Sequence, residues 1–293
     1  MSTEPSGVAD RIRRRLPELP PAERRVARVL LGGYPLAGLE SLAEVAERAG
    51  TSAPTVLRLV GKLGYDGYPH FQRELRGELA ARFSSPLDVL PREPISGLVD
   101  TVREAVIAAV GADLRRLTHD PAMAAAAVLL ADARRPVWVA GGRFSSVLAD
   151  YLHVHLQVLR PRVLRVPGDP GGRHTAVLDL DRRAVVVVFD YRRYQHDTIE
   201  FGRLAVTAGA SLVLFTDHLL SPLAALTEHV VVTTIDSGSP FGVLSPAMAA
   251  VETLLVTVVD RLGSTSRLRM ERYDKLSTEV DSAPPADPTG GGI

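Results

Sequence analysis

Four polar residues stand among apolar ones in the second half of the segment 40–63: Ser52, Thr55, Arg58 and Lys62. Hydroxyl and cationic side chains of these kinds form hydrogen bonds with base edges and with phosphates. The chemistry that they predict is contact with DNA, provided that the chain presents them together on one exposed helix.

The apolar residues of the same segment predict the two helices that such a contact needs. They recur at helical spacing on both sides of Gly50, which permits the positive φ of a tight turn. The apolar positions are Leu42, Val45, Ala46 and Ala49, followed by Val56, Leu59, Val60 and Leu63. This is the helix-turn-helix pattern, in which the second helix enters the major groove. An ordinary helical hairpin is the alternative.

Charge gives this interpretation modest support. Residues 1–83 carry 13 Lys and Arg against 10 Asp and Glu, whereas the whole chain is balanced at 34 against 34. Seven arginines precede the motif: Arg11, Arg13, Arg14, Arg15, Arg24, Arg25 and Arg28. Each of them is as well explained by a solvated helix face.

The resemblance to a known family rests on two stretches, LPPAERRVARVLL and SLAEVAERAGTSAPTVLRLVGKLGYDGYPHFQRELRGEL. Together they resemble the N-terminal domain of the RpiR family of bacterial transcription regulators over about seventy residues. The closing run from Lys62 to Tyr68, with its Leu-Gly-aromatic and Gly-aromatic pairs, is the specific part.

Composition limits the class of protein. A chain of 293 residues has room for two domains with proper cores, and it contains no cysteine, which excludes disulfides and thiolate chemistry. The N-terminus does not have the pattern of a signal peptide, and no apolar run approaches the roughly 20 residues that span a bilayer. We therefore expect a cytoplasmic protein.

Beyond Arg135 short β-branched runs alternate with helical patterns. The predicted strands are 136–140, 162–166, 184–189, 211–216 and 229–234. Continuous valine runs such as VVVVF suit strands buried on both faces of a parallel sheet. The alternation predicts a three-layer α/β domain with an open, mainly parallel, five-stranded sheet, preceded by the all-α helix-turn-helix domain.

The turn after the first strand, Gly141-Gly142-Arg143-Phe144-Ser145-Ser146, has the composition of an anion site. Its glycines allow a tight turn, and a serine caps a helix whose free N–H groups favour an anion. With the strand and helix around it, VWVAGGRFSSVLADYL resembles the sugar isomerase (SIS) domain, as does GASLVLFTDHLLSPLAALTEHVVVT. This resemblance implies binding of phosphorylated sugars and related metabolites.

The loop after the third strand departs from that family. SIS domains hold phosphate there with a Ser-x-Ser-Gly-x-Thr loop, whereas this chain has two arginines and two tyrosines between Phe189 and Thr198. Arginine can grip an anion with its planar fork, so a different anionic ligand and a partly closed pocket both remain open. The effector-binding residues expected here are Gly141, Gly142, Ser145, Ser146, Asp190, Arg192, Arg193 and Thr198.

These patterns divide the chain into four parts. We expect a DNA-binding domain at 1–83, a proline-rich hinge and linker helix at 84–115, an SIS-like domain at 116–280 and a disordered tail at 281–293.

The function expected is a metabolite-sensing transcriptional regulator without cofactor or metal. Its partners would be operator DNA, a small anionic metabolite and a second copy of the chain. Two alternatives remain. A sugar-phosphate isomerase would need a placed base, for which Glu252 and His196 are candidates without a supporting constellation. A regulator with a degenerate, ligand-free SIS domain is the other.

Overall fold

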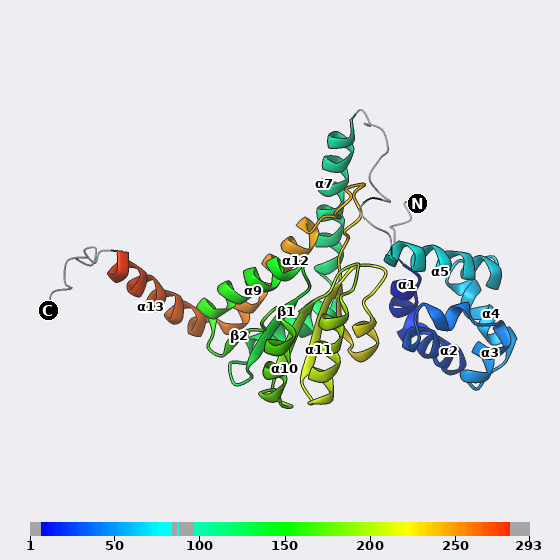
Figure 1. Cartoon of the computed structure of the whole chain (residues 1–293), viewed down its shortest axis with the longest axis horizontal. Helices are drawn as coiled ribbons and strands as arrows, with labels where there is room; N and C mark the ends of the chain where they lie inside the picture. The colour runs from blue at the N-terminus through cyan, green and yellow to red at the C-terminus, as the bar shows by residue number, and fades with distance from the viewer. Residues whose placement is uncertain (1–6, 84–86, 88–96, 282–293) are drawn as a thin grey trace.

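The computed structural model describes residues 7–83, 87 and 97–281 (Figure 1). The proline-rich segment expected to be a hinge lies mostly outside the described residues, and so does nearly all of the tail expected to be disordered. No helix in the described part of the chain is long and apolar enough to cross a membrane.

The first domain is entirely helical, with a small core made by one apolar stripe from each helix. Val26, Val56, Leu59 and Phe71 are fully buried in it. The helices are α1 (Val8–Arg15), α2 (Pro21–Gly32), α3 (Leu42–Arg48), α4 (Ala53–Lys62) and α5 (Tyr68–Phe83), with 3-10 turns η1 (Leu16–Glu18) and η2 (Leu36–Leu39).

Helices α3 and α4 form the predicted helix-turn-helix. Gly50 has φ +56°, in the left-handed region, and the N–H of Thr51 donates to the carbonyl of Ala46 at 2.9 Å. A capping box between Ser41 and Glu44 fixes the start of α3. The turn is therefore closed by backbone hydrogen bonds.

The second domain is built on a parallel five-stranded sheet with strand order β2-β1-β3-β4-β5. Its strands are β1 (Val137–Gly141), β2 (Val163–Arg165), β3 (Val185–Phe189), β4 (Ser211–Thr216) and β5 (His229–Val232). The five predicted strands are thus confirmed, with ends that differ by at most two residues.

Both faces of the sheet are covered, as the valine runs predict. Val185 and Val187 point into one buried cluster, and Val186 and Val188 point into the other. Figure 1 shows α9 (Ser146–Leu159) and α12 (Ser245–Leu262) on one side, and α10 (Pro170–Leu178) and α11 (His196–Thr207) on the other. The first face is completed by α7 (Leu98–Leu117) and α8 (Pro121–Ala131), which pack on α12.

The two domains meet through α1. The Arg13 guanidinium donates to the carbonyl oxygens of Ala224 and Thr227, at 2.9 Å for the latter. Ala9 of α1 is fully buried in the same apolar cluster as Leu212 and Leu214 of β4. The last helix, α13 (Ser264–Asp281), was not predicted and projects from the opposite side of the α/β domain (Figure 1).

Candidate functional site

The outward face of α4 carries three of the four residues expected to contact DNA. Ser52, Arg58 and Lys62 are exposed. Ser52 is the N-cap residue, but its side chain makes no cap hydrogen bond to the backbone of α4. These side chains lie where a recognition helix presents its contacts.

The expectation for Thr55 is not met, because this residue is buried with 4% of its surface exposed. Its hydroxyl accepts a hydrogen bond from Arg58 Nη2 at 2.8 Å and lies 3.1 Å from the Ser52 hydroxyl. Position 55 precedes Leu59 by one helical turn, and so it shares the inward face. Thr55 orients its two neighbours instead of facing solvent.

A buried carboxylate on α2 lies beneath the cations of α4. Glu23 Oε2 accepts from Lys62 Nζ at 2.8 Å, and Glu23 Oε1 lies 4.0 Å from Arg58 Nε. Glu23 is 4% exposed, whereas both cations are largely exposed. One acid therefore anchors both cations while their outer surfaces remain in solvent.

The arginines that precede the motif mostly hold the domain together. Arg25 donates to the carbonyls of Ala49 and Gly50 in the helix-turn-helix turn, at 3.1 and 3.2 Å. The Arg11 guanidinium lies 4.8 Å from the ring centre of Tyr65, and Arg14 pairs with Asp10 at 2.6 Å. Five of the seven, Arg11, Arg13, Arg14, Arg24 and Arg25, are thus engaged in contacts within the described residues.

The second site is a cavity of about 680 Å³ at the carboxyl ends of β1 and β3. The chain runs from β1 outward to β2 and then returns to β3 on the other side, so this is the point where the strand order reverses. Ligands of open α/β sheets bind at such a point. The turn after β1, the loop after β3 and the segment 235–244 line the cavity.

The glycine-rich turn is closed by its own serine. Ser145 Oγ accepts from the Gly142 N–H at 3.0 Å and donates to the Phe189 carbonyl at 2.7 Å. Ser145 lines the cavity, but the predicted cap of α9 by its side chain is absent. A Cβ at Gly141 would lie 2.8 Å from backbone atoms of residues 145 and 146, which explains that glycine.

Gln195 covers the turn from the side of the cavity. It is the N-cap residue of α11, but its side chain makes no cap hydrogen bond, and its Oε1 instead accepts from the backbone N–H of Arg143. A Cβ at Gly142 would lie 2.9 Å from this Oε1. Sequence reasoning did not single out Gln195, and its only signal was its place in the departing loop.

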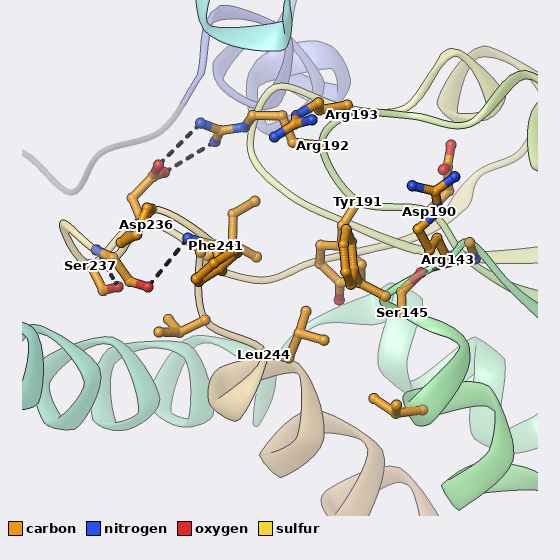
Figure 2. Close-up of a pocket in the computed structure, with 18 of the residues that line it drawn as sticks. Arg143, Ser145, Asp190, Tyr191, Arg192, Arg193, Asp236, Ser237, Phe241 and Leu244 are labelled. Atoms are coloured by element: carbon orange, nitrogen blue, oxygen red, sulfur yellow. Dashed lines mark hydrogen bonds and ion pairs between the residues drawn. The ribbon is translucent and has the colours of Figure 1, made fainter. Parts of the chain in front are cut away.

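Arg192 is neutralised by two acids that lie far away in the sequence. Its Nη1 and Nη2 each lie 3.1 Å from an oxygen of Asp236 (Figure 2), and Nη2 also lies 3.5 Å from Asp217 Oδ1. Burial opposes the charge of Arg192, but the two carboxylates outweigh it and raise its pKa. Arg192 therefore braces the cavity wall.

Asp190 and Tyr191 are buried at the base of the loop. Burial raises the pKa of the Asp190 carboxyl to about 7, although Ser221 Oγ donates to it at 2.5 Å. The Tyr191 hydroxyl lies 2.7 Å from that of Thr233, and burial raises its pKa as well. Tyr191 belongs to the core cluster against which Leu244 packs, and both residues line the cavity (Figure 2).

Three expected effector residues, Gly141, Ser146 and Thr198, do not line the cavity. Thr198 is fully buried, and its hydroxyl accepts from Arg173 Nη1 at 3.0 Å. Ser146 donates to the Arg143 carbonyl at 3.3 Å. None of these three residues is therefore placed for direct contact with a ligand in this cavity.

The cavity wall also contains features that were not predicted. Phe144, in the turn after β1, and Phe241, in the segment 235–244, are 72% and 82% exposed. The guanidinium groups of Arg143 and Arg193 also line it, and neither has a hydrogen-bond or ion-pair partner among the described residues. The wall thus combines free positive charge with aromatic surface.

The bases considered for an isomerase are not assembled. Glu252 is exposed on α12, where it accepts from the Tyr151 hydroxyl at 3.3 Å, and it does not line the cavity. His196 is exposed at the start of α11 and does not line it either. The described residues hold no group of three or more side chains that could bind a metal.

A helical DNA-binding domain joined to a parallel α/β domain defines a two-domain transcriptional regulator, and comparisons identify its family. The helix-turn-helix domain of the rpiR family matches residues 6–82, and the SIS domain matches residues 129–257. The chain belongs to the RpiR family of transcriptional regulators.

Relatives with curated names agree with this assignment. The HTH-type transcriptional regulator HexR of Pseudomonas aeruginosa is 39% identical over 74 residues, which are 25% of this chain and 26% of HexR. The uncharacterized HTH-type transcriptional regulator YbbH of Bacillus subtilis is 23% identical over 217 residues, 72% of this chain and 74% of YbbH. The HexR match is confined to one quarter of each protein.

Solved structures show the same fold. The sugar isomerase domain of an RpiR transcription factor from Sphaerobacter thermophilus aligns with a TM-score of 0.56 and 22% identity, over 61% of this chain and 99% of that one. The Vibrio vulnificus NanR protein, complexed with ManNAc-6P, aligns with a TM-score of 0.53 and 15% identity, over 94% of this chain and 100% of NanR.

Proposed function

We propose that this regulator binds operator DNA through α4 and that its α/β domain senses a small anionic metabolite, a phosphorylated sugar or a related compound. The observation that carries the proposal is the cavity at the strand-order reversal, whose wall includes the free guanidinium groups of Arg143 and Arg193. NanR, which shares the fold, was solved with a phosphorylated sugar.

A series of side-chain and backbone contacts connects the cavity wall to the DNA-binding domain, which supports regulation of DNA binding by the ligand. Asp236 pairs with Arg192 in the cavity wall, and its Oδ2 also lies 3.2 Å from His218 Nδ1. The His218 carbonyl packs against Gly7, where an added Cβ would lie 2.2 Å from its oxygen. A ligand that moves Arg192 would therefore disturb the packing of the α/β domain against the start of α1.

The working unit in this proposal is a cytoplasmic homodimer. One helix-turn-helix contacts a single half-site, and two copies give the affinity and specificity that an operator requires. An effector regulates by binding the DNA-competent and incompetent arrangements unequally.

The test uses the full-length protein in two stages. Genomic fragments that it retains are first selected and footprinted, which identifies the operator. Metabolites are then screened for thermal stabilisation, where a ligand at 100 times its Kd adds about 2.7 kcal/mol. The proposal predicts that a stabilising anion also changes operator affinity. Failure to select any fragment, or stabilisation without an effect on DNA binding, would contradict it.

A further inference from the structure

The side chain of Gln195 occupies the corner of the cavity where the turn after β1 offers a hydrogen-bond donor. Its Oε1 accepts from the Arg143 N–H, although Gln195 itself belongs to the start of α11. The residues that cap a helix from the N-cap position are usually Ser, Thr, Asp or Asn, and the longer side chain of Gln195 reaches across to the neighbouring element instead.

Two other polar groups of this turn are engaged with one another and with the end of β3. The Gly142 N–H donates to Ser145 Oγ, and the Ser145 hydroxyl donates to the Phe189 carbonyl. The Arg143 N–H is held by Gln195 alone among the described residues. An anion that accepts from the Arg143 N–H must therefore take the place of the carboxamide oxygen.

Charge favours such an exchange. A carboxamide oxygen carries only a partial negative charge, whereas hydrogen bonds to an ionised acceptor are roughly twice as strong. Arg143 and Arg193 add positive charge to the same cavity, and neither is paired with an acid within the described residues. The neighbouring Arg192, in contrast, is neutralised by Asp217 and Asp236.

We propose that Gln195 is an internal stand-in for the anionic group of the effector and determines how tightly that group binds. The inference rests on the proposed function, since it concerns the same cavity. The ligand class is an anion with a phosphate or carboxylate group that replaces the carboxamide at the Arg143 N–H. The resident side chain competes with the ligand, so affinity is set by residue 195.

The experiment compares full-length wild type with Gln195→Ala, Gln195→Glu and Gln157→Ala, by calorimetric titration with inorganic phosphate at low ionic strength. Gln157 is the matched control, because it bonds the Val163 carbonyl at 3.2 Å and does not line the cavity. We expect Gln195→Ala to bind phosphate at least tenfold tighter than wild type. Gln195→Glu tethers a carboxylate in the corner and should bind at least tenfold more weakly, while Gln157→Ala should match wild type.

Equal or weaker phosphate binding by Gln195→Ala overturns the inference, and so does the failure of both wild type and Gln195→Ala to bind. The two opposite substitutions keep the test informative if one variant folds poorly, which circular dichroism reveals. Failure of the regulator proposal has a different signature, because it shows in wild type as DNA binding that no metabolite changes.

Discussion

Lys62 Nζ lies 2.8 Å from Glu23 Oε2, so a cation expected to contact DNA is tied to a buried acid on another helix. The bond fixes the lysine stem while 44% of its side chain stays exposed. The pairing makes Lys62 a structural residue as well as a candidate phosphate contact, and the two roles can be separated.

We expect Lys62→Ala to reduce the slope of log Kobs against log salt by about one unit, which is the signature of one lost phosphate contact. It should also lower the free energy of unfolding by about 1–3 kcal/mol, because the buried Glu23 loses a charged hydrogen bond. The double variant with Glu23→Gln should recover stability but not the slope. Urea titrations and binding isotherms at several salt concentrations measure both, and an unchanged slope would remove Lys62 from the DNA.

Arg58→Ala should weaken binding to the operator by about 1–3 kcal/mol while leaving binding to unrelated DNA nearly unchanged, as for a lost base-edge contact. Arg76 on α5 is exposed and provides a matched Arg→Ala control. Fluorescence anisotropy with operator and scrambled duplexes is the measurement. Equal losses on both duplexes would make Arg58 a phosphate contact.

Arg192→Ala should lower the free energy of unfolding by about 1–3 kcal/mol, because fully buried Asp217 loses a charged partner. Arg193→Ala provides the control, since surface substitutions without partners usually change stability by less than about 0.5 kcal/mol. Arg193→Ala should instead weaken binding of the anion. If chemical denaturation shows equal stability for the two variants, the bracing role of Arg192 is wrong.

The sequence predicts most of this architecture because its signals are local. Valine runs buried on both faces identify the strands, and Gly50 marks the turn between α3 and α4. The glycine-rich turn lies at the end of β1, where the sequence predicts it. Its signal is local as well, because the backbone of residues 145 and 146 comes so close to Gly141 that no side chain fits there.

The cavity wall was less predictable because its contacts join distant parts of the chain. Arg192 meets Asp217 and Asp236, 25 and 44 residues further on, so its pairing could not be read from the loop itself. Phe241 was missed because it lies in a loop without periodicity. The burial of Thr55, in contrast, follows from its spacing to Leu59 and could have been found.

Asp190 should make stability depend on pH. Its folded pKa of about 7 lies above the unfolded value near 3.9, so the folded state binds the extra proton between these values. Its contribution is fully favourable below pH 4 and is lost as pH rises toward 7, by about 4 kcal/mol at most. Asp190→Asn keeps an acceptor for Ser221 and cannot ionise.

Urea titrations of wild type and Asp190→Asn at pH 5 and pH 8 isolate this effect from other titrating groups. The variant should gain stability relative to wild type as pH rises. A difference between the two proteins that is the same at both pH values would show that Asp190 is ionised throughout.

Arg13→Ala should release α1 from the α/β domain, because the Arg13 guanidinium is the donor to the Ala224 and Thr227 carbonyls. Each hydrogen bond from a charged group contributes about 1.5–3 kcal/mol, so amide protons of Val8–Arg15 should exchange at least tenfold faster. Arg15→Ala, an exposed residue on the same helix, should leave exchange unchanged. If α1 carries the signal from the cavity, Arg13→Ala should also make operator binding insensitive to the effector while effector binding persists. Hydrogen exchange and anisotropy test the two consequences separately, and unaltered protection of α1 would show that Arg13 does not hold the domains together.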